Sequence, residues 1–543
     1  MSLHRDAPPT GNAAGARKRV PFGDVFTIGL AALGARLFAL PGSGPETLGP
    51  DSAHFLNVAR CFVRGQGFSN VEAWPSWMHP ARLPSPETFK EPAYSWLIAA
   101  GARLGCDPFA TGRMIALLAG ILIPWLTYAL ARAIHPERRV ALLAGLLAAC
   151  SPLLIQHSVV VTADTLFAAL TTAMFLAACE GARATGAVRR SVFDLATGAC
   201  FGLAYLTRAQ VMLAVPALLV LWLGRPTLRS RLQSVALAFS AAVVLASPLL
   251  LRNLRQFGEP LHSDVVRLGI LPYLDQFVVY NSIDLPPAAI PYALAHPAQV
   301  AARVASSLQG LALSTFPHNI LGHPVWMLQF VAGLLLGLGQ RRALGFAYLY
   351  GAVTVAFIAA VWWAPYYFCS LTPIACLFTA IGAGWIADRI GDVPLAGPVT
   401  GGALLFATLA VTLLLQVGVA RRDVRAYHDP ELAATLHEAP FLRAHLAPGE
   451  SVMVMKTSYW AWFTDHPAVS FTLADEPRFM EVIRRLRVRY AALPTSLLPK
   501  LAARSPSGRL PRSLVFDHAD SARDVTVFRI EDPAGAEGGH ATR

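Results

Sequence analysis

Eleven long apolar runs, separated by short polar connections, constrain this chain more than any other feature of its sequence. The runs lie at roughly 23–41, 110–132, 140–155, 163–182, 192–207, 209–224, 233–251, 324–340, 344–362, 366–387 and 399–419. A helix needs about 17–25 mostly apolar residues to cross a bilayer. Lipid offers no hydrogen-bond partners to the backbone, so such runs must be helical. We therefore predict an all-α polytopic membrane protein with about 11 transmembrane helices, in keeping with a composition that is only 14% charged.

Basic residues recur in small clusters between these runs. The clusters are "ARKR", "HPERR", "RATGAVRR", "GRPTLRSR", "GQRR" and "ADRIGD". All six fall on one side of the membrane if the N-terminus is cytoplasmic, which is the asymmetry that the positive-inside rule predicts. The formal net charge of +12 is therefore explained by membrane orientation, and it gives no support to nucleic-acid binding. Residues 1–20 are polar, so we expect a retained membrane anchor rather than a cleaved signal peptide.

This orientation divides the chain into parts. We predict a cytoplasmic tail over 1–22, a transmembrane domain over 23–419 with outer loops 42–109 and 252–323, an extracytoplasmic domain over 420–532 and a disordered tail over 533–543. Short β-prone runs and one amphipathic helix favour a small α/β fold for the outer domain. Of the seven cysteines, Cys61 and Cys106 share one outer loop, and whether they pair stays open.

The loop 42–109 contains two helices that we expect to lie in the membrane interface. Residues 52–64 place apolar side chains on one face and arginines on another, and Gly65 ends the helix. Residues 93–105 predict a second, more apolar helix that is too short to span, and a similar pattern recurs at 296–313. Such helices would roof a cavity whose floor is formed by the outer ends of the spanning helices.

Polar side chains gather at one predicted depth, the outer membrane boundary. They are Asp51, Lys90, Glu91, Asp164, Arg208, Arg252, Asn253 and His262. Structural alternatives exist for most of them: Asp164 could favour a helix N-terminus, Arg208 and Arg252 could snorkel to the headgroups, and Lys90 could be a solvated loop charge. A purely structural role is hardest to justify for Asp51, because a carboxylate at this depth lies beside anionic headgroups.

Together these residues suit a substrate with a phosphate at the headgroup and a long hydrocarbon tail. Arginine binds phosphate oxygens at two points and keeps its charge. A nearby carboxylate can take a proton from an acceptor hydroxyl, while cations stabilise the charge that develops on a leaving phosphate. A transporter with inverted repeats would instead place its site at the membrane midplane, and we find no such repeat. The pattern predicts transfer of a sugar from a lipid-phosphate carrier to a hydroxyl.

Five segments in order over about 40–265 resemble blocks of the GT-C superfamily of integral-membrane glycosyltransferases. They are "PDSAHFLNVARCFVRGQGF", "KEPAYSWLIAAGARLG", "SVVVTADTLFAAL", "GLAYLTRAQVMLAVPALL" and "SPLLLRNLRQFGEPL". The resemblance is greatest to the bacterial branch of protein-mannosyltransferase-like and lipid A aminoarabinose-transferase-like enzymes. It implies a polyprenyl-phosphate-linked sugar donor, a lipid, glycan or protein acceptor, and an inverting transfer on the extracytoplasmic face of the bacterial inner membrane.

The resemblance also implies roles for individual residues. Asp51 would be the catalytic base and Asp164 a second catalytic carboxylate. The substrate-binding group would comprise Lys90, Glu91, Arg208, Arg252, Asn253, His54 and His262. Ser52 stands where an acidic partner of Asp51 is common, which weakens the case for a metal there, and the need for a divalent cation stays open. Two alternatives remain from other classes: a flippase or permease for a lipid-linked substrate, and a non-catalytic scaffold that binds polyprenyl phosphate.

Overall fold

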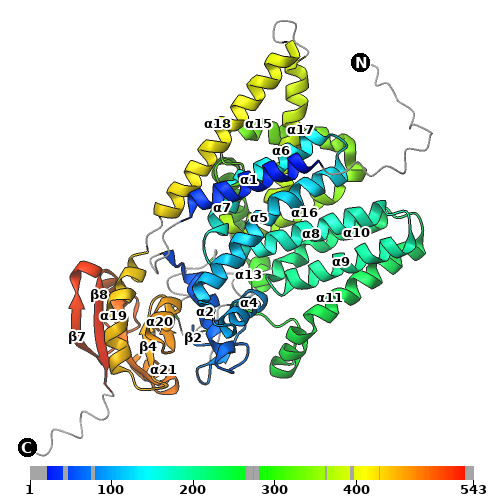
Figure 1. Cartoon of the computed structure of the whole chain (residues 1–543). Helices are drawn as coiled ribbons and strands as arrows, with labels where there is room; N and C mark the ends of the chain where they lie inside the picture. Colours follow the sequence, from blue (N-terminus) through cyan, green and yellow to red (C-terminus); the bar gives the residue numbers. More distant parts are fainter. Residues whose placement is uncertain are drawn as a thin grey trace, which may run out of the picture.

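The fold joins a bundle of apolar helices to a smaller α/β domain at one end (Figure 1). This computed structural model describes residues 21–40, 47–74, 80–264, 273, 281, 282, 284, 287, 289–360, 364–391, 397–426 and 429–531. Residues 1–20 of the predicted tail 1–22, and the predicted tail 533–543, lie outside the described residues.

The helical domain follows the apolar runs of the sequence. Its helices are α1 (Phe22–Ala39), α2 (Pro50–Val63), α4 (Ala93–Arg103), α5 (Pro108–Ile134), α6 (Arg138–Cys150), α7 (Pro152–Ser158), α8 (Asp164–Arg183), α9 (Ala187–Tyr205), η2 (Ala209–Ala214), α10 (Val215–Leu223), α11 (Leu228–Phe257), α13 (Ala289–Ala295), α14 (Pro297–Gly310), η4 (Leu311–Ile320), α15 (Val325–Gly337), η5 (Leu338–Gln340), α16 (Arg341–Ala360), η6 (Pro365–Phe368), α17 (Thr372–Gly391) and α18 (Gly397–Ala426). The short helices predicted in the first outer loop are present as α2 and α4, and α14 corresponds to the pattern at 296–313.

Among the described residues, six helices are long and apolar enough to cross a membrane, and bent helix pairs raise the number to as many as eight. One of these pairs is α6 with α7, which bends by 51°, and the other joins the segment 297–320 to 325–340 at 107°. The eleven predicted runs therefore all fall on helices, but several are too short, too polar or too bent to pass as simple spans. The chain is a multi-pass membrane protein.

The outer domain is built around a six-stranded sheet of order β2-β5-β4-β6-β8-β7. Its strands are β2 (Glu72–Ala73), β4 (Ser451–Val454), β5 (Ala468–Ser470), β6 (Val488–Pro494), β7 (Leu514–Asp520) and β8 (Val525–Ile530). Its helices are α19 (Pro430–His445), α20 (Thr457–Thr464), α21 (Glu476–Leu486), α22 (Leu498–Arg504) and the short η7 (Thr495–Leu497) and η8 (Ser521–Arg523). The predicted small α/β fold is confirmed, with the amphipathic helix at α21.

One strand of this sheet does not come from the C-terminal part of the chain. Strand β2 belongs to the loop 42–109 and pairs in parallel with β5, with Glu72 opposite Ala468. The same loop carries a small antiparallel pair of β1 (Ser69–Asn70) and β3 (Ser85–Pro86). The first outer loop and the C-terminal domain are therefore one folded unit.

The third predicted outer segment reaches the same unit. Ser282, in the loop 252–323, forms a parallel bridge with Leu473, and Asp284 pairs with Arg478 at 2.7 Å. All three segments that the sequence assigns to one side of the membrane thus contact each other.

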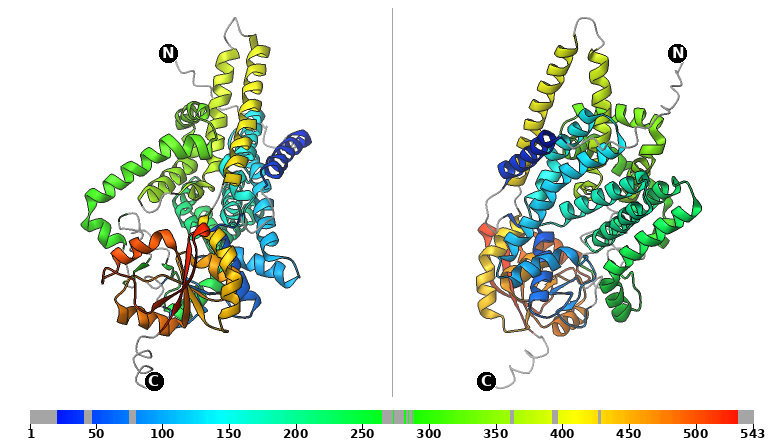
Figure 2. Two further views of the ribbon diagram at one scale, coloured as in Figure 1. Left: turned by 90° about the vertical axis from the view of Figure 1, so that its left-hand side faces the viewer. Right: turned by 45° about the vertical axis from the view of Figure 1, so that its right-hand side comes forward.

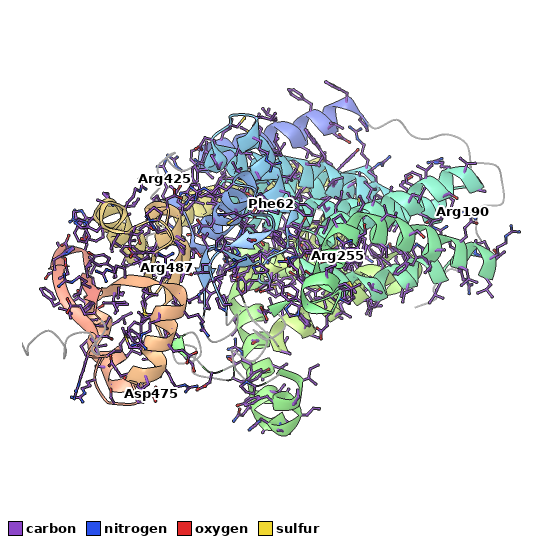
Figure 3. The ribbon with its side chains drawn as sticks, turned by 90° about the horizontal axis from the view of Figure 1, so that it is seen from below. Phe62, Arg190, Arg255, Arg425, Asp475 and Arg487 are labelled. Carbon is purple, nitrogen blue, oxygen red and sulfur yellow. The ribbon has the colours of Figure 1, made fainter. Side chains whose placement is uncertain are left out.

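The predicted cytoplasmic segments also meet. Arg138 pairs with Asp24 at 2.7 Å, and Arg139 pairs with Asp388 at 2.6 Å. Arg190, in another of the basic clusters, lies at the end of the helical domain remote from Asp475 and Arg487 of the outer domain (Figure 3). The facing ends of α17 and α18 also lie far from that domain (Figure 2).

Candidate active site

Asp51 and Lys90 form an ion pair where α2 begins. Pro50 occupies the first turn of α2, which suits its fixed backbone angle, and Asp51 follows it. The Lys90 Nζ lies 3.1 Å from Asp51 Oδ1, with Lys90 17% exposed and Asp51 48% exposed. The same ammonium lies 5.0 Å from the ring centroid of Phe89 and 5.8 Å from that of Phe55. Lys90 is thus held in place, while the carboxylate it contacts stays accessible.

Asp164 and Arg208 form a second, more buried pair. The Arg208 Nη2 lies 2.5 Å from Asp164 Oδ1, and the two side chains are 12% and 5% exposed. The other oxygen of Asp164 accepts a hydrogen bond of 2.5 Å from Thr162 and lies 3.1 Å from His157 Nδ1. Three groups therefore fix the Asp164 carboxylate or balance its charge, and it does not have the accessibility of Asp51.

Short polar links join the two pairs. Ser52 donates to the carbonyl of Val161 at 2.6 Å, which ties the start of α2 to the segment before α8. Glu91 accepts from the Ala209 backbone N–H at 3.0 Å, which ties the residue after Lys90 to the residue after Arg208. Burial raises the pKa of Asp51, but Lys90 and Arg208 outweigh it and hold that pKa below its usual value. Asp51 is therefore ionised at neutral pH.

Two tyrosines complete the surroundings of Arg208. Its guanidinium carbon lies 5.6 Å from the ring centroids of both Tyr366 and Tyr367, which lie in η6. Both rings attract the guanidinium through their negatively charged faces. Neither these tyrosines nor His157 were predicted as site residues, and the available signal was the aromatic "PYYF" where the apolar run 366–387 begins.

His54 lies in a buried cluster rather than at the accessible carboxylate. It is 2% exposed, and its Nδ1 and Nε2 lie 3.3 Å from Glu72 and 3.3 Å from Glu87, both fully buried. Burial lowers the pKa of His54, but the two carboxylates overcome it and raise that pKa to about 10. Glu87 also accepts from the backbone N–H groups of Phe89 and Lys90, at 2.5 and 2.9 Å. The His54 imidazolium thus fixes the loop that carries Lys90.

Arg252, Asn253 and His262 form a neighbouring group around the end of α11. Arg252 donates to the Asn253 side chain at 2.8 Å and to the Phe68 carbonyl at 3.1 Å. Asn253 donates to the carbonyls of Pro260 and His262, and the His262 ring stacks on Phe257 at 4.1 Å. No direct contact with Asp51 or Asp164 is seen in the described part of this group. These residues close the turn after α11.

A metal ion at Asp51 finds little support in the donor set. Asp51 and Asp164 already have cationic partners, Lys90 and Arg208. Within the described residues, the group of three or more His, Cys, Asp or Glu donors with metal-binding spacing lies elsewhere, in the outer domain. Cys61 and Cys106 are both free thiols, the first buried and the second exposed.

Comparison with known proteins identifies the architecture. The family model described as dolichyl-phosphate-mannose-protein mannosyltransferase matches residues 85–251, which contain Lys90, Asp164 and Arg208. The solved ArnT of Cupriavidus metallidurans superposes with a TM-score of 0.60 at 14% identity, covering 93% of this chain and 98% of that one. The fold is that of the GT-C glycosyltransferases. No curated protein matches the sequence at a significant level.

Two further structures share the GT-C fold and contain a lipid phosphate. ArnT of the same organism bound to undecaprenyl phosphate has a TM-score of 0.55 at 14% identity, covering 94% of this chain and 98% of that one. The archaeal oligosaccharyltransferase AglB of Archaeoglobus fulgidus, in complex with an inhibitory peptide and a dolichol-phosphate, has a TM-score of 0.62 at 11% identity. The match covers 94% of this chain and 74% of AglB. The predicted GT-C resemblance is thus confirmed for the fold.

Proposed function

We propose that this protein transfers a sugar from a polyprenyl-phosphate donor to an acceptor hydroxyl, on the extracytoplasmic face of a bacterial inner membrane. One observation carries the proposal. A half-exposed carboxylate, Asp51, pairs with Lys90 at 3.1 Å and is close enough to Arg208 for the charge of that guanidinium to lower its pKa, in a GT-C fold. The three groups match what such a reaction needs: a proton acceptor and two groups that bind phosphate.

The chemistry assigns each group a task. Asp51 takes the proton from the acceptor hydroxyl as the oxygen of that hydroxyl forms its bond to the anomeric carbon. The bond from that carbon to the phosphate oxygen breaks, and polyprenyl phosphate leaves with the electron pair. Lys90 and Arg208 stabilise the charge on the leaving phosphate. Attack from the face opposite the phosphate inverts the anomeric centre.

Asp164 acts in this scheme through Arg208. Its carboxylate is buried and holds the guanidinium at 2.5 Å, so it is a positioning residue rather than a second base. His54 and Glu91 have similar roles, because they fix the backbone on either side of Lys90 through Glu87 and Ala209. Arg252, Asn253 and His262 support the outer loop rather than the phosphate.

The contacts among the three predicted outer segments support the orientation. One end of the molecule brings together the three segments 42–109, 252–323 and 420–532. Two of the predicted basic connections form ion pairs through Arg138 and Arg139, and a third, which contains Arg190, lies at the opposite end. Because basic clusters favour the cytoplasm, the end that carries Asp51 faces outward.

The decisive test replaces Asp51 by Asn. Asp107 is the matched control, because it lies in the same outer loop, is exposed and caps α5 by accepting from the Ala110 N–H at 2.7 Å. An Asn can also cap a helix. Cells that lack the protein are complemented with the wild type, Asp51→Asn or Asp107→Asn, and their envelope lipids and glycans are analysed by mass spectrometry.

We expect the wild type and Asp107→Asn to restore one sugar modification and Asp51→Asn to lose it. Removing a general base typically slows a reaction about 10²–10⁴-fold. Purified Asp51→Asn should still bind undecaprenyl phosphate. Full restoration by this variant would remove Asp51 from the mechanism. Movement of labelled lipid-linked sugar across the bilayer without transfer would favour the flippase, and phosphate binding without either would favour the scaffold.

A further inference from the structure

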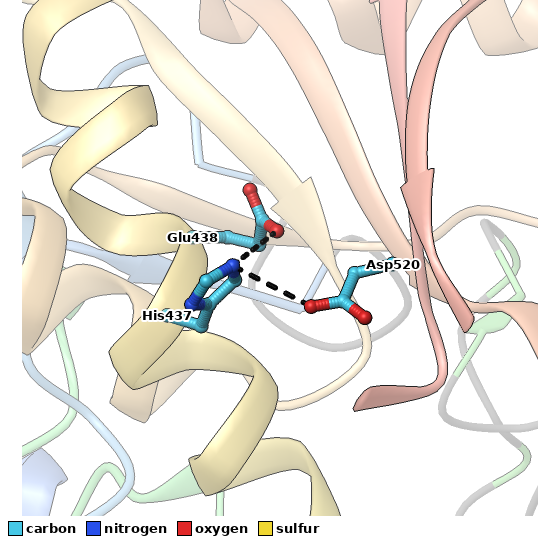
Figure 4. Close-up of side chains that lie close together, drawn as sticks. All are labelled: His437, Glu438 and Asp520. Atoms are coloured by element: carbon cyan, nitrogen blue, oxygen red, sulfur yellow. Dashed lines mark ion pairs between the residues drawn. The ribbon is translucent and has the colours of Figure 1, made fainter. Parts of the chain in front are cut away.

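A cluster of metal-ligating side chains lies in the outer domain, where α19 packs over the edge strand β7. His437 and Glu438 are consecutive residues of α19, and Asp520 ends β7 (Figure 4). The His437 Nε2 lies 3.4 Å from Asp520 Oδ2 and 3.8 Å from Glu438 Oε1. The catalytic scheme proposed above does not involve these residues.

The spacing of the three donor atoms fits one small ion between them. Zinc bound by His nitrogen and carboxylate oxygen at about 2.0–2.2 Å in tetrahedral geometry places neighbouring ligand atoms about 3.4 Å apart. The two distances to His437 Nε2 are close to that value, and all three donor atoms lie within 4.8 Å of one another. Glu438 is 5% exposed, Asp520 is 19% exposed and His437 is 48% exposed, so the site opens to solvent on the histidine side.

A second histidine orients the buried carboxylate. His518, in β7, has its Nε2 3.0 Å from Glu438 Oε2, the oxygen that points away from His437. The Nδ1 of His518 lies 2.8 Å from Asp517. A metal-bound carboxylate is commonly held in this way by a hydrogen-bond donor on its free oxygen.

The charge of the cluster calls for a further cation. Two carboxylates belong to it, those of Glu438 and Asp520, and Arg523 Nη1 donates to Asp520 Oδ2, the oxygen that also faces His437, at 2.6 Å. One arginine against two carboxylates leaves one negative charge, and His437 lies on the exposed side of the cluster. A divalent ion bound between the three side chains would balance that charge.

We propose that His437 Nε2, Glu438 Oε1 and Asp520 Oδ2 bind a divalent transition-metal ion of the zinc class, with water in the fourth position. Mixed imidazole and carboxylate donors suit zinc better than magnesium or calcium, which prefer oxygen ligands alone. The ion joins α19 to the edge of the sheet. It therefore stabilises the packing of α19, the first helix of the outer domain after α18.

The test uses the full chain in detergent, first stripped with a chelator and then titrated with Zn²⁺ alone. His445 provides the matched control: it is an exposed histidine of the same helix, and its Nδ1 contacts the Phe441 carbonyl at 2.8 Å. We expect the wild type and His445→Ala to bind one Zn²⁺ per chain by elemental analysis. Loss of a mere partner of a ligand weakens metal binding about 10–100-fold, so His437→Ala should weaken it at least about tenfold.

Two further readouts separate a site from adventitious binding. Zn²⁺ should raise the midpoint of thermal unfolding of the wild type and of His445→Ala, but not of His437→Ala, because a ligand that binds the folded state stabilises it. Co²⁺ in place of zinc should give the visible absorption of a tetrahedral centre. Equal Zn²⁺ binding by the wild type and His437→Ala, or no binding by the wild type at micromolar zinc, would overturn the proposal. Transfer activity does not enter this test, so its outcome is independent of the proposed reaction.

Discussion

At the scale of single residues, the candidate site divides its charges between a buried pair and an accessible one. Asp164 and Arg208 are 5% and 12% exposed, whereas Asp51 is 48% exposed beside Lys90. A buried carboxylate held by several donors is stable but unavailable as a base. The accessible carboxylate, Asp51, can contact a substrate. The buried one, Asp164, holds Arg208 where its charge still acts on Asp51.

This division leads to a prediction for Arg208. Replacing it by Ala should weaken the binding of undecaprenyl phosphate by roughly tenfold to a hundredfold, because a hydrogen bond to a charged group contributes about 1.5–3 kcal/mol. Arg208→Lys should bind at an intermediate level, since lysine keeps the charge against Asp164 but not the two-point contact. Affinity is measured by titration of the purified protein in lipid nanodiscs.

Arg103 is the control for non-specific attraction between arginine and lipid headgroups. It is exposed in the first outer loop, 42–109, and donates to the Phe62 carbonyl at 2.9 Å. Arg103→Ala should bind undecaprenyl phosphate like the wild type. If Arg208→Ala and Arg208→Lys both keep the wild-type affinity, Arg208 only pairs with Asp164 and the snorkelling explanation returns.

At the scale of elements, the buried imidazolium of His54 joins three pieces of the first outer loop. It lies on α2 between Glu72 of β2 and Glu87 of the segment that precedes Lys90. Glu72 in turn accepts from Asn57 at 2.9 Å and from Ser458 of α20 at 2.5 Å. The position of Lys90 thus depends on a cluster that also holds the outer domain.

The raised pKa of His54 predicts how stability depends on pH. The folded state holds the proton up to a pH of about 10, and an unfolded histidine releases it near 6.5. The contribution of this group to stability is therefore fully present below about pH 6.5 and is lost as the pH rises through about 10. At neutral pH, His54→Gln leaves two buried carboxylates without their partner, which typically costs about 3–5 kcal/mol.

The measurement is the thermal unfolding midpoint of the wild type and of His54→Gln between pH 6 and pH 11. We expect a large difference at pH 6–7 that shrinks steadily towards about pH 10. His445→Gln, an exposed histidine on α19, should follow the wild type throughout. A difference that stays constant over this range would mean that His54 is neutral and acts through packing alone.

The sequence predicted these elements better than their contacts. Apolar periodicity located α2 and α4, because a helix shows its period within four residues. It did not locate β2, since a strand of two residues, Glu72 and Ala73, has no period to detect. The carboxylate partners of His54 come from parts of the loop with no regular pattern, so the sequence could not indicate this cluster. His54 was therefore predicted to bind substrate.

At the scale of the whole molecule, hydropathy fixes where a residue lies along the membrane normal but not which helices are neighbours. The predicted depth placed Asp51, Lys90, Asp164 and Arg208 together, and the structure pairs them. Arg252 lies at the same predicted depth but supports the Phe68 turn. The eleven predicted runs are all helical, yet bends such as the 107° angle after η4 depend on packing that composition does not encode.

The orientation of the molecule gives the last prediction. Cys106 is an exposed cysteine in the first outer loop, whereas Val188 is 81% exposed within a predicted cytoplasmic cluster. In sealed right-side-out vesicles, a membrane-impermeant maleimide should label Cys106 of the wild type. A variant with Cys106→Ala and Val188→Cys should be labelled only after detergent is added, because its thiol faces the lumen. Inside-out vesicles should reverse both results.

The charged clusters and the contacts among the three outer segments point to the same arrangement. Labelling of both thiols from one side would therefore mean that the chain crosses the membrane differently between residues 106 and 188. Labelling of Cys106 only from the cytoplasmic side would mean that Asp51 does not face outward.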